Sequence, residues 1–157
     1  FEVAGYNLEG NELGAAFGLI QLKSLNRNIE MREKNFNLQN EFFSKYDQIF
    51  SIPEQAKNIK TAWLAYPILI NKEANFKRKD FQIFLEKRDI QTRVVFTGNI
   101  IRQPMMKNIK YKTNKDGYPN SDAVMERGVL LPLHHGMTDE MFNRLHQTIE
   151  EFIQKHV

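Results

Sequence analysis

The polar segment over residues 92–104, TRVVFTGNIIRQP, holds the densest group of side chains that could bind a ligand. Arg93 and Arg102 supply two cations, and Asn99 and Gln103 add two amides. An arginine guanidinium is a planar fork that suits phosphate or carboxylate, while amides suit the hydroxyl groups of a sugar. The segment is therefore a candidate ligand-binding loop. The alternative is a solvated loop in which Arg93 forms a local salt bridge.

A second candidate is the histidine pair His134 and His135 in LLPLHHGMT. Neighbouring side chains of an extended segment point to opposite faces, so the two rings are poorly placed to chelate one metal ion. No carboxylate lies nearby at the spacing of a metal ligand. We expect no metal here, and the pair belongs either to a structural junction between strand and helix or to a substrate cleft.

Other kinds of catalytic site are excluded or lack their residues. The chain has no cysteine, which excludes disulfides, thiolate metal sites and cysteine nucleophiles. Asp89, Asp122 and Asp139 each have an ordinary explanation as turn or cap residues, and no pair of carboxylates stands out. Gly14 and Gly18 lie within a helical pattern, so they form no dinucleotide-binding fingerprint. The residues alone supply no complete catalytic set.

Composition and charge describe an ordinary globular protein. Of 157 residues, 41% are hydrophobic and 26% are charged, and the net charge is only +3. The one notable basic cluster, over residues 72–79, is interpreted as a solvated face between a loop and a helix.

Charge, aromatic residues and the length of apolar runs bear on two classes of partner, RNA and membranes. A small sheet with helices and a basic net charge also suits an RNA-binding module, with Phe96 and Tyr66 stacking on bases. No aromatic–basic strand motif of that class is present, so we expect no strongly salt-dependent RNA binding. The longest apolar run, 62–70, is shorter than the roughly 20 residues of a membrane span. We expect a cytoplasmic protein without nucleic-acid or membrane partners.

The elements that would position these residues begin with a long helix over residues 11–46. Asn11 is a suitable N-cap, and Glu12 in the first turn favours the positive end of the helix dipole. The helix is longer than usual, and a break near Asn26 is expected. Its length indicates an arm that connects two bodies.

The remaining elements alternate between strands and helices. We expect strands at 62–70, 92–96 and 129–133, helices at 78–87 and 122–127, and a final helix capped by Thr138. Pro67 within the first strand favours an edge or a bulge. This order predicts an α+β fold, a small, mostly antiparallel sheet with helices packed on one face. Residues 1–46 would be an interface loop and linking helix, and residues 47–157 a small C-terminal domain.

Two motifs resemble those of the DegT/DnrJ-type family of PLP-dependent nucleotide-sugar aminotransferases and dehydratases. One is GYN followed by a helix with AAFGLIQL, and the other is LLPLHHGMTDEMFNRL before the last helix. Their order and spacing agree with the family, so the resemblance covers essentially the whole chain. Each motif alone is weak, but together they are fairly specific.

The resemblance implies that the chain is the small C-terminal domain of a fold-type-I PLP enzyme. The large domain with the cofactor pocket would lie upstream and be absent from this chain, and the long helix would link the two domains. Enzymes of this family are homodimers with active sites at the interface. The family's GYN asparagine, which contacts the PLP phosphate of the neighbouring subunit, maps onto Asn7. A neutral amide can donate a hydrogen bond to a phosphate oxygen.

The segment QTRVVFTGNIIRQPMM departs from the His-Tyr-Pro-Leu-His-like stretch of ordinary sugar aminotransferases. It is similar to the TR-x-x-F-x-GN-x-x-RQP pattern of the 3-dehydratases that act on CDP-4-keto-6-deoxy sugars. In that branch a histidine replaces the Schiff-base lysine, and PLP or PMP chemistry removes the C3 hydroxyl. LPLHHG is closer to the aminotransferases. The deciding residue lies outside this chain, so both reactions stay open, with 3-dehydration favoured.

The resemblance, with loop position and chemistry, assigns expected roles in surface-polysaccharide or deoxysugar biosynthesis. The expected contacts to the sugar nucleotide are Tyr6, Arg93, Phe96, Asn99 and Arg102, with His134 or His135 at the border of the same cleft. No catalytic residue is expected in the chain, so alone it should be inactive. A non-catalytic dimerisation domain is an alternative of another class.

Overall fold

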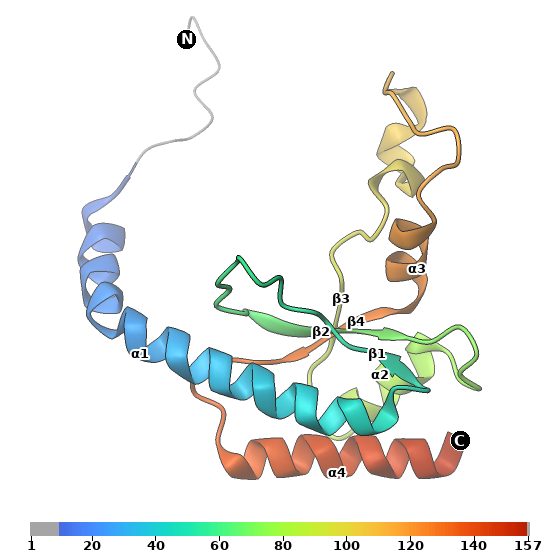
Figure 1. Ribbon diagram of the computed structural model, residues 1–157. Helices are drawn as coiled ribbons and strands as arrows, with labels where there is room; N and C mark the ends of the chain where they lie inside the picture. Colours follow the sequence, from blue (N-terminus) through green and yellow to red (C-terminus); the bar gives the residue numbers. More distant parts are fainter. Residues whose placement is uncertain (1–9, 157) are drawn as a thin grey trace, which may run out of the picture.

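The computed structural model describes residues 10–156, in which three helices lie on one side of a small sheet and a fourth, over residues 119–127, rises from its other side (Figure 1). The elements are α1 (Glu12–Phe43), β1 (Phe50–Ser51), β2 (Ala65–Ile70), α2 (Arg78–Glu86), β3 (Arg93–Val94), α3 (Pro119–Arg127), β4 (Gly128–Pro132) and α4 (Asp139–His156). Short 3-10 turns are η1 (Ser44–Tyr46), η2 (Ile100–Arg102) and η3 (Pro104–Asn108). Tyr6 and Asn7 lie outside the described residues.

The sheet has the order β1-β2-β4-β3, and every neighbouring pair is antiparallel. The longest ladder joins β2 to β4, from Ala65 opposite Pro132 to Leu69 opposite Gly128. The α+β class and the antiparallel sheet are therefore confirmed. The two-residue strand β1 was not predicted, because so short a segment has no alternation to detect.

Pro67 lies in β2, which is an interior strand in the sheet order. β1 pairs only with Leu69 and Ile70, so β2 has no strand partner on that side at Pro67. A proline lacks the N–H of a ladder hydrogen bond and is tolerated where one side of a strand is unpaired. At Pro67 the strand β2 therefore has the unpaired side of an edge strand, as expected.

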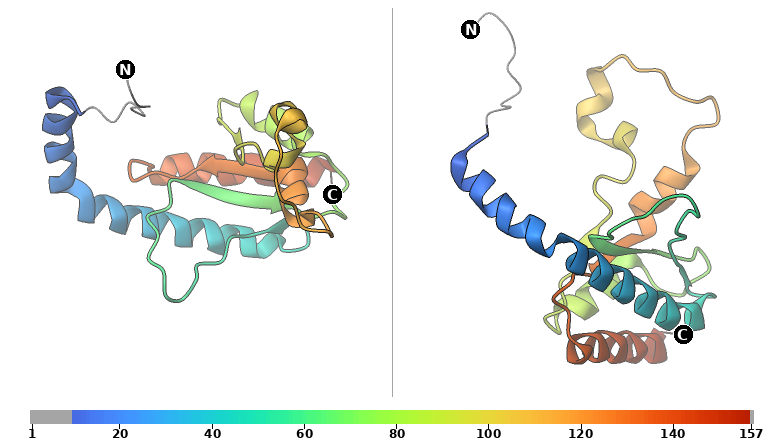
Figure 2. Two further views of the ribbon diagram at one scale, coloured as in Figure 1. Left: turned by 90° about the horizontal axis from the view of Figure 1, so that it is seen from above. Right: turned by 60° about the vertical axis from the view of Figure 1, so that its left-hand side comes forward.

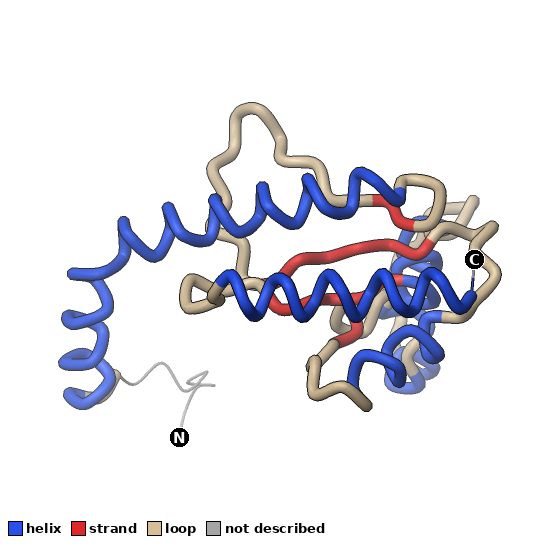
Figure 3. Tube along the Cα trace, turned by 90° about the horizontal axis from the view of Figure 1, so that it is seen from below, coloured by secondary structure: helices blue, strands red, loops and turns tan. Residues whose placement is uncertain are grey.

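The two faces of the sheet differ in burial. Tyr66, Ile68 and Ile70 of β2 alternate with half-buried neighbours, and Val129 and Leu131 of β4 share their buried face. Figure 3, seen from below, shows α1, α2 and α4 covering that face. The opposite face carries half-buried and exposed side chains. Helices on one face were predicted, and this is confirmed.

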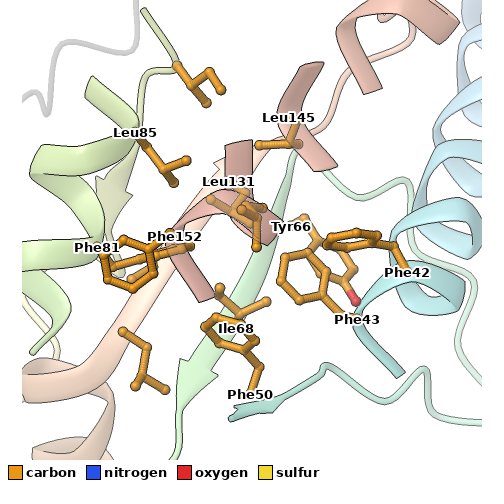
Figure 4. Packing of buried hydrophobic residues seen from close by; sticks show 14 of the residues in the cluster. Phe42, Phe43, Phe50, Tyr66, Ile68, Phe81, Leu85, Leu131, Leu145 and Phe152 are labelled. Carbon is orange, nitrogen blue, oxygen red and sulfur yellow. The ribbon is translucent and has the colours of Figure 1, made fainter. Parts of the chain in front are cut away.

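Aromatic side chains join the elements of the core (Figure 4). Phe43 of α1 stacks on Tyr66 with ring centroids 5.4 Å apart. Phe50 of β1 lies 5.6 Å from Phe81 of α2, which lies 5.1 Å from Phe152 of α4. Such pairs add stability beyond the burial of their area. The chain of rings fixes three helices to one face of the sheet.

Helix α1 changes in direction and in burial along its length. The amide N–H of Gly14 donates to Asn11 Oδ1 at 2.7 Å, so Asn11 is the N-cap as predicted. The helix is continuous through Asn26, so the predicted break is wrong. Its first turns nevertheless bend away from the rest (Figures 1 and 2). The C-terminal half buries Phe36 and Phe43, whereas the N-terminal half projects beyond the sheet with its apolar side chains exposed. This projecting half is consistent with an arm.

Helix α4 follows the predicted pattern. Thr138 Oγ1 accepts a hydrogen bond from the amide N–H of Met141 at 3.4 Å, which caps the helix. Its apolar face is buried and includes Phe142, Leu145, Ile149, Phe152 and Ile153.

Candidate functional site

Arg93 lies on the edge strand β3, directly opposite Leu130 of β4. Directly opposed residues of an antiparallel pair share one face of the sheet, so Arg93 projects from the open face that no helix covers. Its exposed guanidinium forms no salt bridge within residues 10–156. The alternative of a local salt bridge for Arg93 is therefore wrong in the described part of the chain.

Arg93, Val94, Phe96 and Leu130 line one shallow hollow of about 440 Å³. The ring of Phe96 is 87% exposed, and its backbone is in the left-handed region, with φ of 46°. A bulky residue rarely adopts this conformation, which persists only where the surroundings impose it. The hollow thus combines a free cation with an exposed aromatic ring, which together suit an anionic ligand that also carries a ring.

The backbone after Phe96 turns at Gly98, which has φ of 67°. The amide N–H of Gly98 donates to Val95 O at 2.9 Å and closes the turn. A Cβ on Gly98 would overlap the Cα and Cβ of Met125 in α3. Only glycine allows the loop to lie this close to the helix.

Asn99 and Arg102, predicted to contact substrate, are both bound to Asp122 of α3. Asn99 is 3% exposed, and its Nδ2 donates to Asp122 Oδ1 at 2.8 Å. Arg102 donates through Nε to Oδ1 at 3.0 Å and through Nη2 to Oδ2 at 2.8 Å. Hydrogen bonds from Arg102, and next from Asn99, lower the pKa of Asp122 to about 2. The two side chains hold the loop to α3, and their contact with substrate stays a prediction.

Asp122 is the residue of this site that sequence reasoning missed. It was explained as an ordinary turn or cap residue, and it does lie in the first turn of α3. Its partners are 20 and 23 residues away in the chain, and no local pattern reports a pairing over that distance.

His134 and His135 lie in the connection between β4 and α4. Both side chains are exposed, and their ring centroids are 6.5 Å apart with the planes 84° from parallel. His134 Nδ1 accepts a hydrogen bond from the amide N–H of Gly136 at 3.1 Å, and Asn35 Nδ2 donates to the His134 carbonyl at 2.8 Å. Desolvation lowers the pKa of His134, and the neighbouring charge of His135 lowers it further. These contacts describe a well-fixed junction between strand and helix.

The two groups of predicted substrate residues are separate in the described structure. The connection between β4 and α4 leaves one end of the sheet, while the segment with η2 and η3 rises from the other end (Figures 1 and 2). Arg93 and Phe96 are brought together, but the histidine pair does not join them. Over residues 10–156, no three histidine or acidic side chains are grouped as metal ligands, and no helix has the length and hydropathy of a membrane span.

A family model described as the DegT/DnrJ/EryC1/StrS aminotransferase family matches residues 1–150. The chain belongs to this family. The resemblance carried by the GYN and LPLHHG motifs is thereby confirmed.

Two relatives of this family member are similar over nearly all of its length. It is 30% identical to the "Lipopolysaccharide biosynthesis protein RfbH" of Salmonella typhimurium, over 94% of this chain and 34% of that protein. It is 32% identical to the "dTDP-4-dehydro-2,6-dideoxy-D-glucose 3-dehydratase" of Saccharopolyspora spinosa, over 99% of this chain and 33% of that protein. The chain thus spans about a third of the length of each curated relative.

The fold is also that of solved structures. The crystal structure of the E. coli GDP-4-keto-6-deoxy-D-mannose-3-dehydratase, with bound hydrated PLP, superposes with a TM-score of 0.83 at 23% identity. The match covers 94% of this chain and 37% of that one. The DegT family fold therefore accounts for the antiparallel sheet and the long first helix.

Proposed function

We propose that this chain is the C-terminal part of a PLP- or PMP-dependent enzyme that acts on a nucleotide-linked 4-keto-6-deoxy sugar. The reaction would be 3-dehydration, in the biosynthesis of a surface polysaccharide such as lipopolysaccharide. Membership of the DegT family supports the reaction class. The names of the Salmonella and Saccharopolyspora relatives support the pathway and the dehydration.

The observation that carries the proposal is the hollow with Arg93 and Phe96 at the β3 edge of the sheet. A free guanidinium suits a phosphate of the nucleotide, and an exposed aromatic ring suits a flat base or the apolar face of a sugar. The hollow is open on one side, so other parts of the enzyme would complete it. Asn99 and Arg102 would support this site from behind, through Asp122.

The described residues fit a supporting role toward the cofactor. Every lysine within residues 10–156 is exposed, and none lies in the closed, desolvated setting of a Schiff-base lysine. Asn7, by resemblance, would donate to the PLP phosphate. The cofactor supplies the electron sink of the reaction, and this chain would contribute binding and orientation.

Partners follow from the same proposal. The enzyme would be a homodimer, with Asn7 and Tyr6 of one subunit serving the active site of the other. An RNA-binding module is not supported, because Tyr66 is 0% exposed and cannot stack on a base. A purely structural dimerisation domain would leave the free cation of Arg93 without a role.

Amination is the second candidate reaction, favoured by the family description and by LPLHHG in this chain. To decide, the full-length enzyme is incubated with PMP, a reductant system, and CDP-, GDP- or dTDP-linked 4-keto-6-deoxyhexose. We expect a product that lacks the C3 hydroxyl. A stable 4-amino sugar formed from PLP and glutamate would establish amination, and turnover of none of these sugars would contradict the proposal.

Arg93 is tested by Arg93→Ala in the full-length enzyme. Loss of one charge-assisted contact to phosphate should raise KM for the sugar nucleotide by about tenfold to a hundredfold, with a smaller change in kcat. Lys107→Ala, which removes an exposed cation outside the hollow, is the matched control. Equal effects of the two variants would indicate general electrostatics and would contradict a specific role for Arg93.

The isolated chain of residues 1–157 provides a further test. Mixed with PLP, it should show neither a visible Schiff-base absorbance after gel filtration nor transamination. Stoichiometric covalent PLP on this chain would contradict the assignment of the cofactor-linking residue to the rest of the enzyme.

A further inference from the structure

We propose that Asp122 is a positioning residue that sets the orientation of Phe96 toward the sugar nucleotide. The inference rests on the proposed function for the use of the hollow. Its structural part concerns only contacts within the described residues.

The ring of Phe96 is not held by packing of its own. Phe96 is 87% exposed, so the backbone of residues 95–98 sets the direction of its Cα–Cβ bond, from which the ring projects. That turn is closed by the hydrogen bond from Gly98 N–H to Val95 O. A positive φ at Phe96 needs surroundings that over-determine it. Restraint on the turn comes from Gln103 Nε2, which donates to Thr97 O at 3.1 Å, and from two residues that follow the turn, Asn99 and Arg102.

Asp122 is the common acceptor of Asn99 and Arg102. Its Oδ1 accepts from both Asn99 Nδ2 and Arg102 Nε, and its Oδ2 accepts from Arg102 Nη2. Asn99 Oδ1 also accepts from the N–H of Ile101, so the same side chain fixes the start of η2. One carboxylate thus holds three hydrogen bonds from two points of the loop, and its removal leaves the buried Asn99 amide without this partner.

Arg93 is held in a different way. It is paired in the sheet through β3 and β4, before the turn begins. Release of the loop should therefore disturb Phe96 more than Arg93. This difference separates positioning by Asp122 from a general loss of structure.

The test is a double-mutant cycle in the full-length enzyme, with KM for the sugar nucleotide as the readout. Asp122→Ala should raise KM by up to about tenfold with a smaller change in kcat, which is the effect expected when the aromatic contact of Phe96 is lost. The effect should be much smaller in a Phe96→Ala background, and should persist undiminished in an Arg93→Ala background. Glu126→Ala, which removes an exposed carboxylate one turn later on α3, is the matched control with unchanged KM. If Asp122→Ala does not fold, Asp122→Asn replaces it in the cycle, because asparagine preserves the shape of the side chain and removes its charge.

A second readout does not depend on activity. The enzyme is labelled with fluorophenylalanine, and the ¹⁹F signal of Phe96 is assigned by its loss in Phe96→Leu. Asp122→Ala should change the chemical shift or the width of this signal, because the turn that carries Phe96 is released, and Glu126→Ala should leave the signal unchanged. An unchanged Phe96 signal, or full additivity of Asp122→Ala with Phe96→Ala, would overturn the inference. If the wild-type enzyme turns over no sugar nucleotide, the proposed function fails, and the ¹⁹F result alone still decides whether Asp122 positions Phe96.

Discussion

At the scale of single residues, chemical type predicts what a side chain can do, and its neighbours decide whether it is free to do it. Arg93 and Arg102 are both arginines of the segment 92–104, yet only Arg102 is bound to Asp122 in the described structure. The two cations and two amides were visible in the sequence. Which cation is free depends on a carboxylate 20 residues further along, and so required the fold.

The neighbours of half-buried His146 likewise decide its behaviour. They make the stability of the protein depend on pH. Its ring stacks on Phe42 with centroids 3.8 Å apart, and its Nε2 lies 2.9 Å from Gln39 Oε1. Desolvation lowers the pKa of His146 to about 4, Glu150 opposes the shift, and Lys45 adds to it. The folded state thus excludes a proton that the unfolded chain takes up near pH 6.5.

Because the folded pKa is the lower of the two, the folded state should lose stability as pH falls from about 6.5 to about 4. The full loss is at most about 3.5 kcal/mol, since each pKa unit corresponds to about 1.4 kcal/mol. Urea unfolding of the chain across this range, compared with His146→Gln, measures it. The variant should have a flatter profile than the wild type, because glutamine does not titrate. Parallel profiles for wild type and His146→Gln would contradict the assignment.

At the scale of elements, periodic patterns predicted the helices and the two longest strands of the sheet. α2 and α4 were predicted within a residue or two because buried rings recur at helical spacing along each. The break expected at Asn26 was wrong because one asparagine costs a helix interior only about 0.7 kcal/mol, which good helix formers around it offset. The strand predicted at 92–96 is present only as the two residues of β3, and β1 was not predicted, because the pairing of strands this short is set by tertiary contacts.

The contact between the loop and α3 can be tested with two glycines. Gly98 and Gly117 have nearly the same conformation, with φ of 67° and 68°, but only a Cβ at Gly98 would meet another element. Gly117→Ala should cost about 1 kcal/mol for the left-handed conformation alone. Gly98→Ala should cost about 3 kcal/mol or release the loop from α3, because Met125 occupies the space. Equal changes in the urea midpoint, with no change in loop mobility by hydrogen exchange, would show that the close approach is absent in solution.

At the scale of the whole molecule, the described residues bury one face of the sheet and leave two apolar surfaces uncovered. One is the open face of the sheet beside Arg93. The other is the projecting half of α1, whose exposed side chains include Leu13, Phe17, Leu19, Ile20, Leu22 and Leu25. Apolar residues at helical spacing are visible in the sequence, but periodicity cannot say whether they are covered within the same chain. The matched relatives are about three times as long, and the proposed enzyme has further surface to cover both.

Exposed apolar side chains along one helix should make the isolated chain of residues 1–157 associate with itself. We expect its average mass in sedimentation to rise with concentration, and the substitutions Leu13→Glu and Phe17→Glu together to reduce that rise. Both side chains are exposed, at 85% and 69%, so the urea midpoint should change little. Phe43→Ala, in the packed half of the same helix, should instead cost about 3–5 kcal/mol, because it opens a cavity among the core rings. A wild-type chain that stays monomeric at every concentration would mean that the projecting half of α1 is covered within the chain itself. A large loss of stability in the glutamate variant would lead to the same conclusion.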